Sequence, residues 1–372
     1  MKISRASVFI FLAFIIGHSA RAADWTTVAS PSVGKQANTL LGVAAAADND
    51  VWAVGAAYNL RLNAYRTVIE HWNGATWSVV KSPNATTGYN LLNGVAVVAA
   101  NDVWTVGQAA VGSTSNTLVE HWNGSAWSVV SSPNVPGSSS ILQAVSVVSA
   151  SDIWAVGYST DANFVRHLLT LHWDGASWSI VASPGLGILF AVDVVGSNDV
   201  WATGESEPAE QTLTLHWNGS AWSIVPSPND STEDNILFGV AAVASNDVWA
   251  VGNAGSLKTL ALHWDGASWS VMPTPAFGSD VSNEVLVGIV ALSSNNIWTA
   301  GQFVLPLQGS AQQTLTENWN GSSWNVVASP DAPNSNNRLH SITATPNGTL
   351  WAVGTVGVFG KPEKTLILRK SP

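Results

Sequence analysis

Seven acidic residues gather in the middle of the chain, where carboxylates could bind a cation or supply an acid and a base. They are Asp193, Glu205, Glu207, Glu210, Asp230, Glu233 and Asp234. Clustered carboxylates suit a hard cation such as Ca²⁺, which takes about 6–8 oxygen ligands. Two carboxylates that face each other across a sugar could instead cleave a polysaccharide, with Asp193 as one of the pair. No Asp-x-Asp-x-Asp-Gly loop is present, so a solvated acidic rim is the third interpretation.

Five histidines recur together with five aspartates at fixed places in a repeated phrase. The histidines are His71, His121, His172, His216 and His263, and the aspartates are Asp50, Asp102, Asp152, Asp199 and Asp247. The two positions change together. The sixth unit has Asn296 and Asn318 in their place, and the seventh has Thr349 and Arg369. Five separate copies cannot converge on one catalytic or metal site. We therefore expect structural Asp–His hydrogen bonds of about 1.5–3 kcal/mol each.

Several kinds of chemistry are excluded by composition. The chain has no cysteine, so disulfides, thiolate metal sites and cysteine nucleophiles cannot occur. Neither a Gly-x-Ser-x-Gly elbow nor a His-Glu-x-x-His motif is present. Outside the first 22 residues, only His167 and His340 lie apart from the repeated histidines. We expect these two to be loop and channel-mouth residues rather than catalytic bases.

The chain is organised as seven repeats. The phrase Asp-Val-Trp-Ala-Val-Gly or a close variant occurs seven times, with its tryptophans spaced 47 to 53 residues apart. These are Trp52, Trp104, Trp154, Trp201, Trp249, Trp298 and Trp351. A second phrase, His-Trp-Asn-Gly-x-x-Trp-Ser, occurs six times, and Ser-Pro or Thr-Pro follows it. Periods of this length are typical of β-propellers and other repeat folds.

Each repeat predicts four short strands, named a to d. In the second unit these are residues 94–98, 103–107, 117–122 and 126–130. The segments are rich in Val, Trp and Thr and are bounded by Asn-Asp or Asn-Gly, which is typical of strands and turns. The seventh unit ends at its strand c, whereas residues 24–31 read as an unpaired strand d. We therefore predict an all-β, seven-bladed β-propeller of four-stranded blades, closed by the N-terminal strand completing blade seven.

The repeat resembles the Kelch type of β-propeller, the fold of the central domain of galactose oxidase. The glycine after strand b, the aromatic residue ending strand c and the tryptophan starting strand d carry this resemblance across residues 24–369. The Kelch unit usually has a double glycine, whereas Gly55, Gly107 and their equivalents stand alone. The resemblance implies the fold. The copper chemistry of galactose oxidase is excluded because it needs a cysteine.

The N-terminal segment predicts export by a bacterium. Lys2 and Arg5 precede an apolar run, and Ala20-Arg21-Ala22 supplies a cleavage pattern, so residues 1–22 read as a secretory signal peptide and 23–372 as one propeller domain. The mature chain would have 11 basic and 24 acidic residues, a net charge of −13. Such a charge disfavours nucleic acid and anionic lipid as partners. We expect a monomer that is secreted and does not insert into membranes.

Function is expected where the repeats differ. The a–b and c–d turns are nearly identical between units, whereas the b–c and d–a connections vary and project from the opposite side, which we call the variable face. Seven side chains, each eleven residues before a repeat tryptophan, are predicted to ring the mouth of the central channel on that face. They are Leu41, Asn93, Gln143, Phe190, Phe238, Val287 and His340. Tyr58, Tyr89 and Tyr158 are predicted to join them, with other aromatic residues such as Phe277 in the same connections.

These observations favour a non-enzymatic module that binds a glycan or an extended peptide on the variable face. One alternative is a polysaccharide hydrolase or lyase that uses the acidic residues of blade four, with Asp193 among them. A purely structural surface protein, in which the aromatic residues only pack loops onto the ring, is the second alternative. No cofactor is required by the sequence, and Ca²⁺ is the one that its acidic residues would suit.

Overall fold

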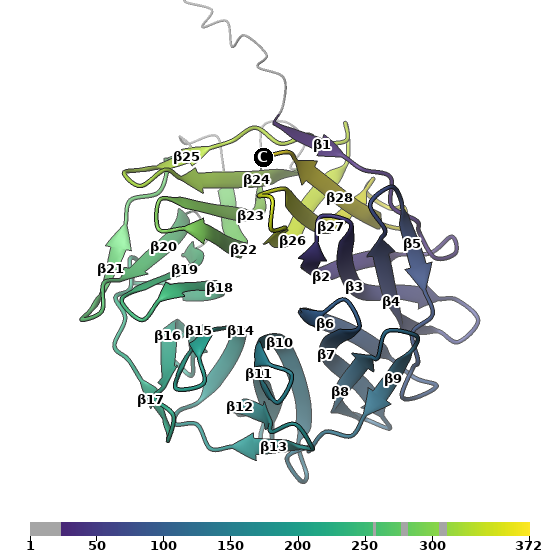
Figure 1. The fold of residues 1–372 in the computed structure, drawn as a ribbon, viewed down its shortest axis with the longest axis horizontal. Helices are drawn as coiled ribbons and strands as arrows, with labels where there is room; N and C mark the ends of the chain where they lie inside the picture. The colour runs from purple at the N-terminus through teal and green to yellow at the C-terminus, as the bar shows by residue number, and fades with distance from the viewer. Residues whose placement is uncertain (1–23, 256–257, 277–281, 305–310) are drawn as a thin grey trace, which may run out of the picture.

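The structure is a computed structural model that describes residues 24–255, 258–276, 282–304 and 311–372. The predicted signal peptide at 1–22 and Phe277 lie outside the described residues. Twenty-eight strands form seven four-stranded antiparallel sheets around one axis, which Figure 1 views end on. The predicted seven-bladed β-propeller is confirmed. No helix in the described ranges is long and apolar enough to span a lipid bilayer.

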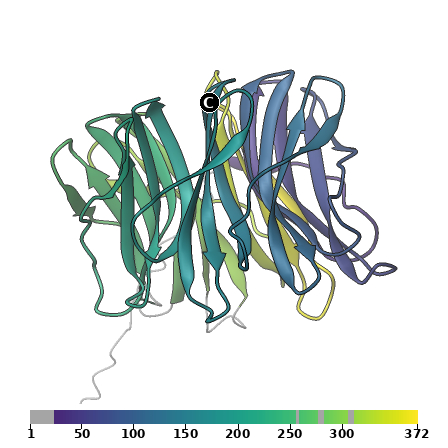
Figure 2. The same cartoon turned by 90° about the horizontal axis from the view of Figure 1, so that it is seen from below.

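Each blade places strand a at the centre and strand d at the rim. Blades one to four are β2 (Asn38–Ala47), β3 (Asp50–Asn59), β4 (Ala64–Trp72), β5 (Trp77–Val80); β6 (Asn90–Ala99), β7 (Asp102–Val111), β8 (Thr114–Trp122), β9 (Trp127–Val130); β10 (Ser139–Ser149), β11 (Asp152–Thr160), β12 (Arg166–Trp173), β13 (Trp178–Val181); and β14 (Gly187–Gly196), β15 (Asp199–Ser206), β16 (Gln211–Trp217), β17 (Trp222–Ile224). Blades five to seven are β18 (Asn235–Ala244), β19 (Asp247–Ala254), β20 (Lys258–Trp264), β21 (Trp269–Met272); β22 (Ser282–Ser293), β23 (Asn296–Val304), β24 (Gln312–Trp319), β25 (Trp324–Val326); and β26 (Asn336–Ala344), β27 (Leu350–Gly357), β28 (Lys364–Lys370), β1 (Trp25–Thr27). Figure 2 shows the blades side on, with loops at both ends of the strands.

The ring closes as the sequence predicts. β1 pairs antiparallel with β28, so that Trp25 lies opposite Lys370 and Thr27 lies opposite Leu368. Trp25 is buried in one apolar cluster with Leu366. The first and last strands of the described chain therefore share blade seven, which leaves no open sheet between the ends.

Tryptophan side chains join each blade to the preceding one. The strand-d tryptophan of every blade meets the strand-b tryptophan of the preceding blade nearly edge-on, with ring centroids 5.2–6.2 Å apart. All seven strand-d indole nitrogens are buried without a hydrogen-bond acceptor among the described residues. These contacts hold together a chain that has no disulfide.

The predicted Asp–His pairs are confirmed in all five blades. The histidine Nε2 lies 2.7–2.9 Å from the aspartate Oδ1. Each histidine also packs against the strand-b tryptophan of its own blade, with centroids 4.1–4.5 Å apart. In blade six, Asn318 Nδ2 donates to Asn296 Oδ1 over 3.1 Å. In blade seven, Arg369 lies over Trp351, a cation in place of the imidazole.

Candidate functional site

Every innermost strand carries a β-bulge at the same place. The pairing between strands a and b shifts by one residue there, which leaves seven residues without a partner in the register: Leu41, Asn93, Gln143, Phe190, Phe238, Val287 and His340. A bulge disrupts the local ladder and re-aims the side chain of its extra residue. These are the same seven positions that the sequence predicts at the channel mouth.

The single glycine of the repeat lies within strand b, not after it as the sequence predicts, and it allows strand a to approach closely. A β-carbon on Gly107 would lie 2.0 Å from the carbonyl oxygen of Leu91 on β6. Any side chain at this position would therefore clash with the backbone of strand a. The same contact, at 1.8–2.1 Å, occurs at Gly55, Gly107, Gly157, Gly204, Gly252, Gly301 and Gly354. The repeat therefore encodes the close approach of strands a and b that shapes the channel.

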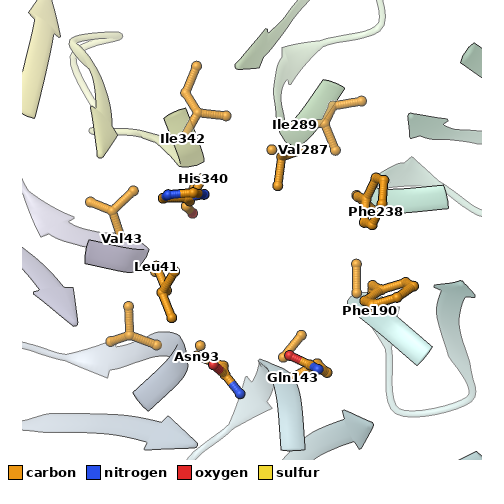
Figure 3. Close-up of a pocket in the computed structure, with 18 of the residues that line it drawn as sticks. Leu41, Val43, Asn93, Gln143, Phe190, Phe238, Val287, Ile289, His340 and Ile342 are labelled. Atoms are coloured by element: carbon orange, nitrogen blue, oxygen red, sulfur yellow. The ribbon is translucent and has the colours of Figure 1, made fainter. Parts of the chain in front are cut away.

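The seven bulge residues line one cavity of about 290 Å³ at the centre of the ring. Figure 3 shows their side chains arranged around its open middle. The volume lies at the lower end of the range for small-molecule pockets, about 300–1,000 Å³. Below, we call this space the channel-mouth cavity. It can hold one protruding group of a ligand rather than a long segment.

The wall of the channel-mouth cavity is chemically uneven. Phe190 and Phe238 come from adjacent blades and touch, with ring centroids 5.0 Å apart (Figure 3). Gln143 and Asn93 follow on the next two blades. Asn93 Nδ2 donates to the carbonyl oxygen of Leu142 over 2.8 Å, which leaves its amide oxygen available. An aromatic side beside an amide side can orient a group that has both apolar and hydrogen-bonding parts.

His340 completes the wall as an uncharged group. Its Nε2 lies 3.4 Å from Thr355 Oγ1, and it is half-buried. Burial, with a smaller effect of Arg338, lowers the pKa of His340 to about 4. The imidazole is therefore neutral at neutral pH, and the channel-mouth cavity has no charged bulge residue under those conditions.

Asp193 lies in the central channel, apart from the acidic residues in the connections of blade four. It lines a second cavity of about 590 Å³, toward the a–b turns. Its carboxylate accepts hydrogen bonds from Ser146 Oγ at 3.2 Å, Val194 N at 2.9 Å and Ala242 N at 2.8 Å. Burial raises its pKa. Asp193 thereby links the inner strands of blades three, four and five.

The loop carboxylates of blade four are engaged with cations or with each other. Glu205 lies 3.4 Å from Arg166, which also pairs with Glu207. Asp230 pairs with Lys258. Contact with Asp234 raises the pKa of Glu210, while Glu233 is exposed. Within the described ranges, no three acidic or histidine side chains are grouped so that they could hold a metal ion.

Tyr58, Tyr89 and Tyr158 are absent from the lining of the channel-mouth cavity. Tyr58 instead packs on Tyr65, with centroids 5.3 Å apart, and Tyr65 packs on Tyr89 at 5.7 Å. Tyr158 lies opposite Ile141, two residues from Gln143 on β10. The structure thus separates the predicted site into a channel-mouth cavity and a tyrosine cluster beside it.

A set of buried polar residues that was not predicted from the sequence shapes the d–a loops. They stand fourteen residues before the strand-b tryptophan: Asn38, Asn90, Ser140, Asn235 and Asn337. The side-chain oxygen of each accepts a backbone N–H from the preceding loop over 2.8–3.2 Å. Their constant spacing is a signal that could have revealed them. They fix the loops that surround the channel mouth.

A second missed feature is a set of buried glutamates in strand c. Glu70, Glu120 and Glu317 are fully buried where blades three to five have Leu171, Leu215 and Leu262. Burial raises the pKa of Glu70 to about 7 and those of Glu120 and Glu317 to about 8. Ser82 Oγ donates to Glu120 and Ser30 Oγ to Glu70, each over 2.8 Å. These carboxyl groups lie in the scaffold and contribute nothing to the channel mouth.

Comparisons with known proteins identify the fold alone. No protein-family model and no curated protein sequence matches the chain. Among solved structures, YCF48 bound to a D1 peptide is similar with a TM-score of 0.59 and 15% identity over 94% of this chain and 95% of that one. The GH74 xyloglucanase from Xanthomonas campestris has a TM-score of 0.56 and 11% identity over 92% of this chain and 55% of that one. The SapL1 lectin in complex with alpha methyl fucoside has a TM-score of 0.50 and 15% identity over 80% and 98%.

Proposed function

We propose that this chain is a secreted, non-enzymatic binding module that holds a glycan or an extended peptide on its variable face. One protruding group of the ligand enters the channel-mouth cavity. The observation that carries this proposal is that seven side chains of six residue types, at equivalent positions of one repeat, lie at bulges and line a single cavity. The proposal that the protein is secreted is supported by the signal peptide predicted at residues 1–22. The resemblance of the repeat to the Kelch type stays a prediction.

Binding is a better account of this face than hydrolysis. Glu210 and Asp234 are in direct contact, so no sugar fits between them, and Asp193 lies in the other half of the channel. A glycosidase needs its two carboxyl groups about 5–9.5 Å apart with the substrate between them. Two of the similar structures contain a bound peptide or a bound sugar, which supports a binding role for this architecture.

The proposal is tested by screening the mature protein against arrays of glycans and of peptides. We expect one class of probe to bind, and Phe238→Ala and Gln143→Ala to weaken it by about 10-fold or more, equivalent to about 1.4 kcal/mol. Val129→Ala is the control, because that side chain is 44% exposed on β9 at the outer rim of blade two, outside the connections that form the variable face. Equal binding by wild type and both cavity variants would refute the site.

A further inference from the structure

All four tyrosines of the chain lie in one region of the variable face. Twenty tryptophans are used in the repeats, whereas the four tyrosines fall outside the repeated phrases. Tyr58 is the penultimate residue of β3, Tyr65 is the second residue of β4, Tyr89 precedes β6, and Tyr158 lies near the end of β11. They follow blades one to three in order. We call these four residues the tyrosine arc.

Three rings of the tyrosine arc, those of Tyr58, Tyr65 and Tyr89, form a chain of contacts and are mutually inclined. The Tyr58 and Tyr65 planes make an angle of 70°, and those of Tyr65 and Tyr89 an angle of 69°. Burial raises the pKa of Tyr89, and the neighbouring phenols of Tyr65 and Tyr158 raise it further. All four side chains are only half-buried, so the arc presents ring edges and faces to solvent.

The arc is held rigidly before any ligand binds. Arg66 Nη1 donates to the carbonyl oxygens of Thr86 at 2.7 Å and Gly88 at 3.0 Å, which fixes the loop that carries Tyr89. Buried Asn90 donates to the same two carbonyl groups. At the other end, the Tyr58 hydroxyl hydrogen bonds to Asn63. A preorganised surface loses little entropy on binding.

The arc itself offers aromatic rings and uncharged hydroxyl groups. The hydroxyl groups of Tyr65, Tyr89 and Tyr158 have no hydrogen-bond partner within the described part of the chain. Two cations beside the arc are engaged, Arg66 with loop carbonyls and Arg166 with Glu205 and Glu207. Arg61, in the loop between Tyr58 and Tyr65, is exposed. Electron-rich ring faces attract polarised C–H groups, and free phenols hydrogen bond to hydroxyls. A neutral sugar presents these two kinds of group.

The arc adjoins the amide side of the channel-mouth cavity. Tyr89 stands four residues before Asn93 on the chain that forms β6, and Tyr158 pairs with Ile141, two residues before Gln143. We propose that the tyrosine arc is a stacking surface for a neutral glycan chain whose terminal sugar enters the channel-mouth cavity beside Asn93 and Gln143. This inference rests on the proposed function and selects the glycan from its two ligand classes.

The test uses neutral oligosaccharides of increasing length, from monosaccharides upward, with binding measured by calorimetry. We expect Tyr65→Ala and Tyr89→Ala to weaken the longer chains by about 2- to 10-fold each, from the size of aromatic contacts, and to leave monosaccharide binding unchanged. Gln143→Ala should weaken both. Tyr89→Phe keeps the ring and should retain most of the affinity, and thermal melting confirms that each variant folds.

The outcomes separate the two proposals. If the alanine variants bind long and short glycans as wild type does, while Gln143→Ala weakens both, the stacking role is refuted and the cavity stands. If peptides bind and no glycan does, the glycan inference fails and the binding function survives. If neither class binds to the full mature chain, both proposals fall.

Discussion

Replacing Glu120 by glutamine should make the protein more stable at neutral pH. Glu120 on β8 is fully buried, and burial raises its pKa to about 8 although Ser82 donates a hydrogen bond to it. Its second oxygen has no partner among the described residues. The folded protein therefore holds this carboxyl group protonated over a pH range in which the unfolded chain releases the proton. Glutamine has nearly the same shape and can accept the bond from Ser82 without ever ionising.

The sign and size follow from linkage. A pKa raised from 4.5 to about 8 stabilises the folded state fully below pH 4.5, and this stabilisation is lost as the pH rises toward 8. Each pH unit costs about 1.4 kcal/mol, so wild type should lose about 3 kcal/mol between pH 4.5 and pH 7 from this group alone. The variant should match wild type near pH 4.5 and exceed it by about 3 kcal/mol at pH 7.

The assay is urea unfolding of both proteins, followed by tryptophan fluorescence at several pH values between 4.5 and 8. Comparison of midpoints at equal slope isolates a change in stability. Glu120→Leu, which copies the residue of blades three to five, should behave like the glutamine variant at pH 7. Glu233→Gln, on an exposed loop, is the control for the substitution itself. If the wild-type and Glu120→Gln curves run parallel across the pH range, the carboxylate must have an internal partner and the reasoning is wrong.

Two further predictions concern the scaffold. Gly204→Ala should destabilise the folded protein by more than about 4 kcal/mol or prevent folding, because its β-carbon would lie 1.8 Å from the Ile188 carbonyl oxygen. Gly196→Ala in the same blade has open space around it and should be neutral or stabilise the protein by about 0.4–1 kcal/mol. Equal losses of stability in thermal melts of the two variants would contradict this prediction. A double-mutant cycle of Asp102→Asn and His121→Asn should show a coupling energy of about 1.5–3 kcal/mol by chemical denaturation, and additive losses would mean that the 2.8 Å contact contributes nothing.

The fold could be predicted because the repeat has unusually distinct landmarks. Tryptophans at two fixed places fix the blade count, and the unpaired strand at Trp25 fixes the closure. Strands a and b are nevertheless longer than predicted: β6 covers Asn90–Ala99 where only 94–98 was expected. The reason is the bulge at Asn93. Residues 90–92 precede the bulge and pair with β7 in a register shifted by one residue. This shift interrupts the alternation of apolar and polar residues by which a strand is recognised in a sequence.

The position of the candidate cavity could be predicted from the sequence, but its separation from the tyrosines and from Asp193 could not. Spacing from the repeat tryptophan places all seven bulge residues correctly around one cavity, because each occupies an equivalent position in the same unit. Side-chain direction in loops has no such periodic guide. Sequence order therefore grouped Tyr58 and Tyr158 with the channel mouth and Asp193 with the blade-four loops, whereas packing sets them apart.

The contacts that hold the ring together explain why the channel mouth is free to vary. Each strand-b tryptophan is covered by aromatic or cationic groups. In most blades one of these groups is the strand-c tryptophan of the next blade. Blade seven has Lys370 at that position instead, and its side chain lies over Trp298. These contacts involve strands b, c and d only. The bulge on strand a makes none of them and faces the channel. Six different residue types fill its seven copies, although each copy has the same scaffold behind it. This position is therefore free to vary without loss of the scaffold contacts, which is the property that the proposed binding role requires.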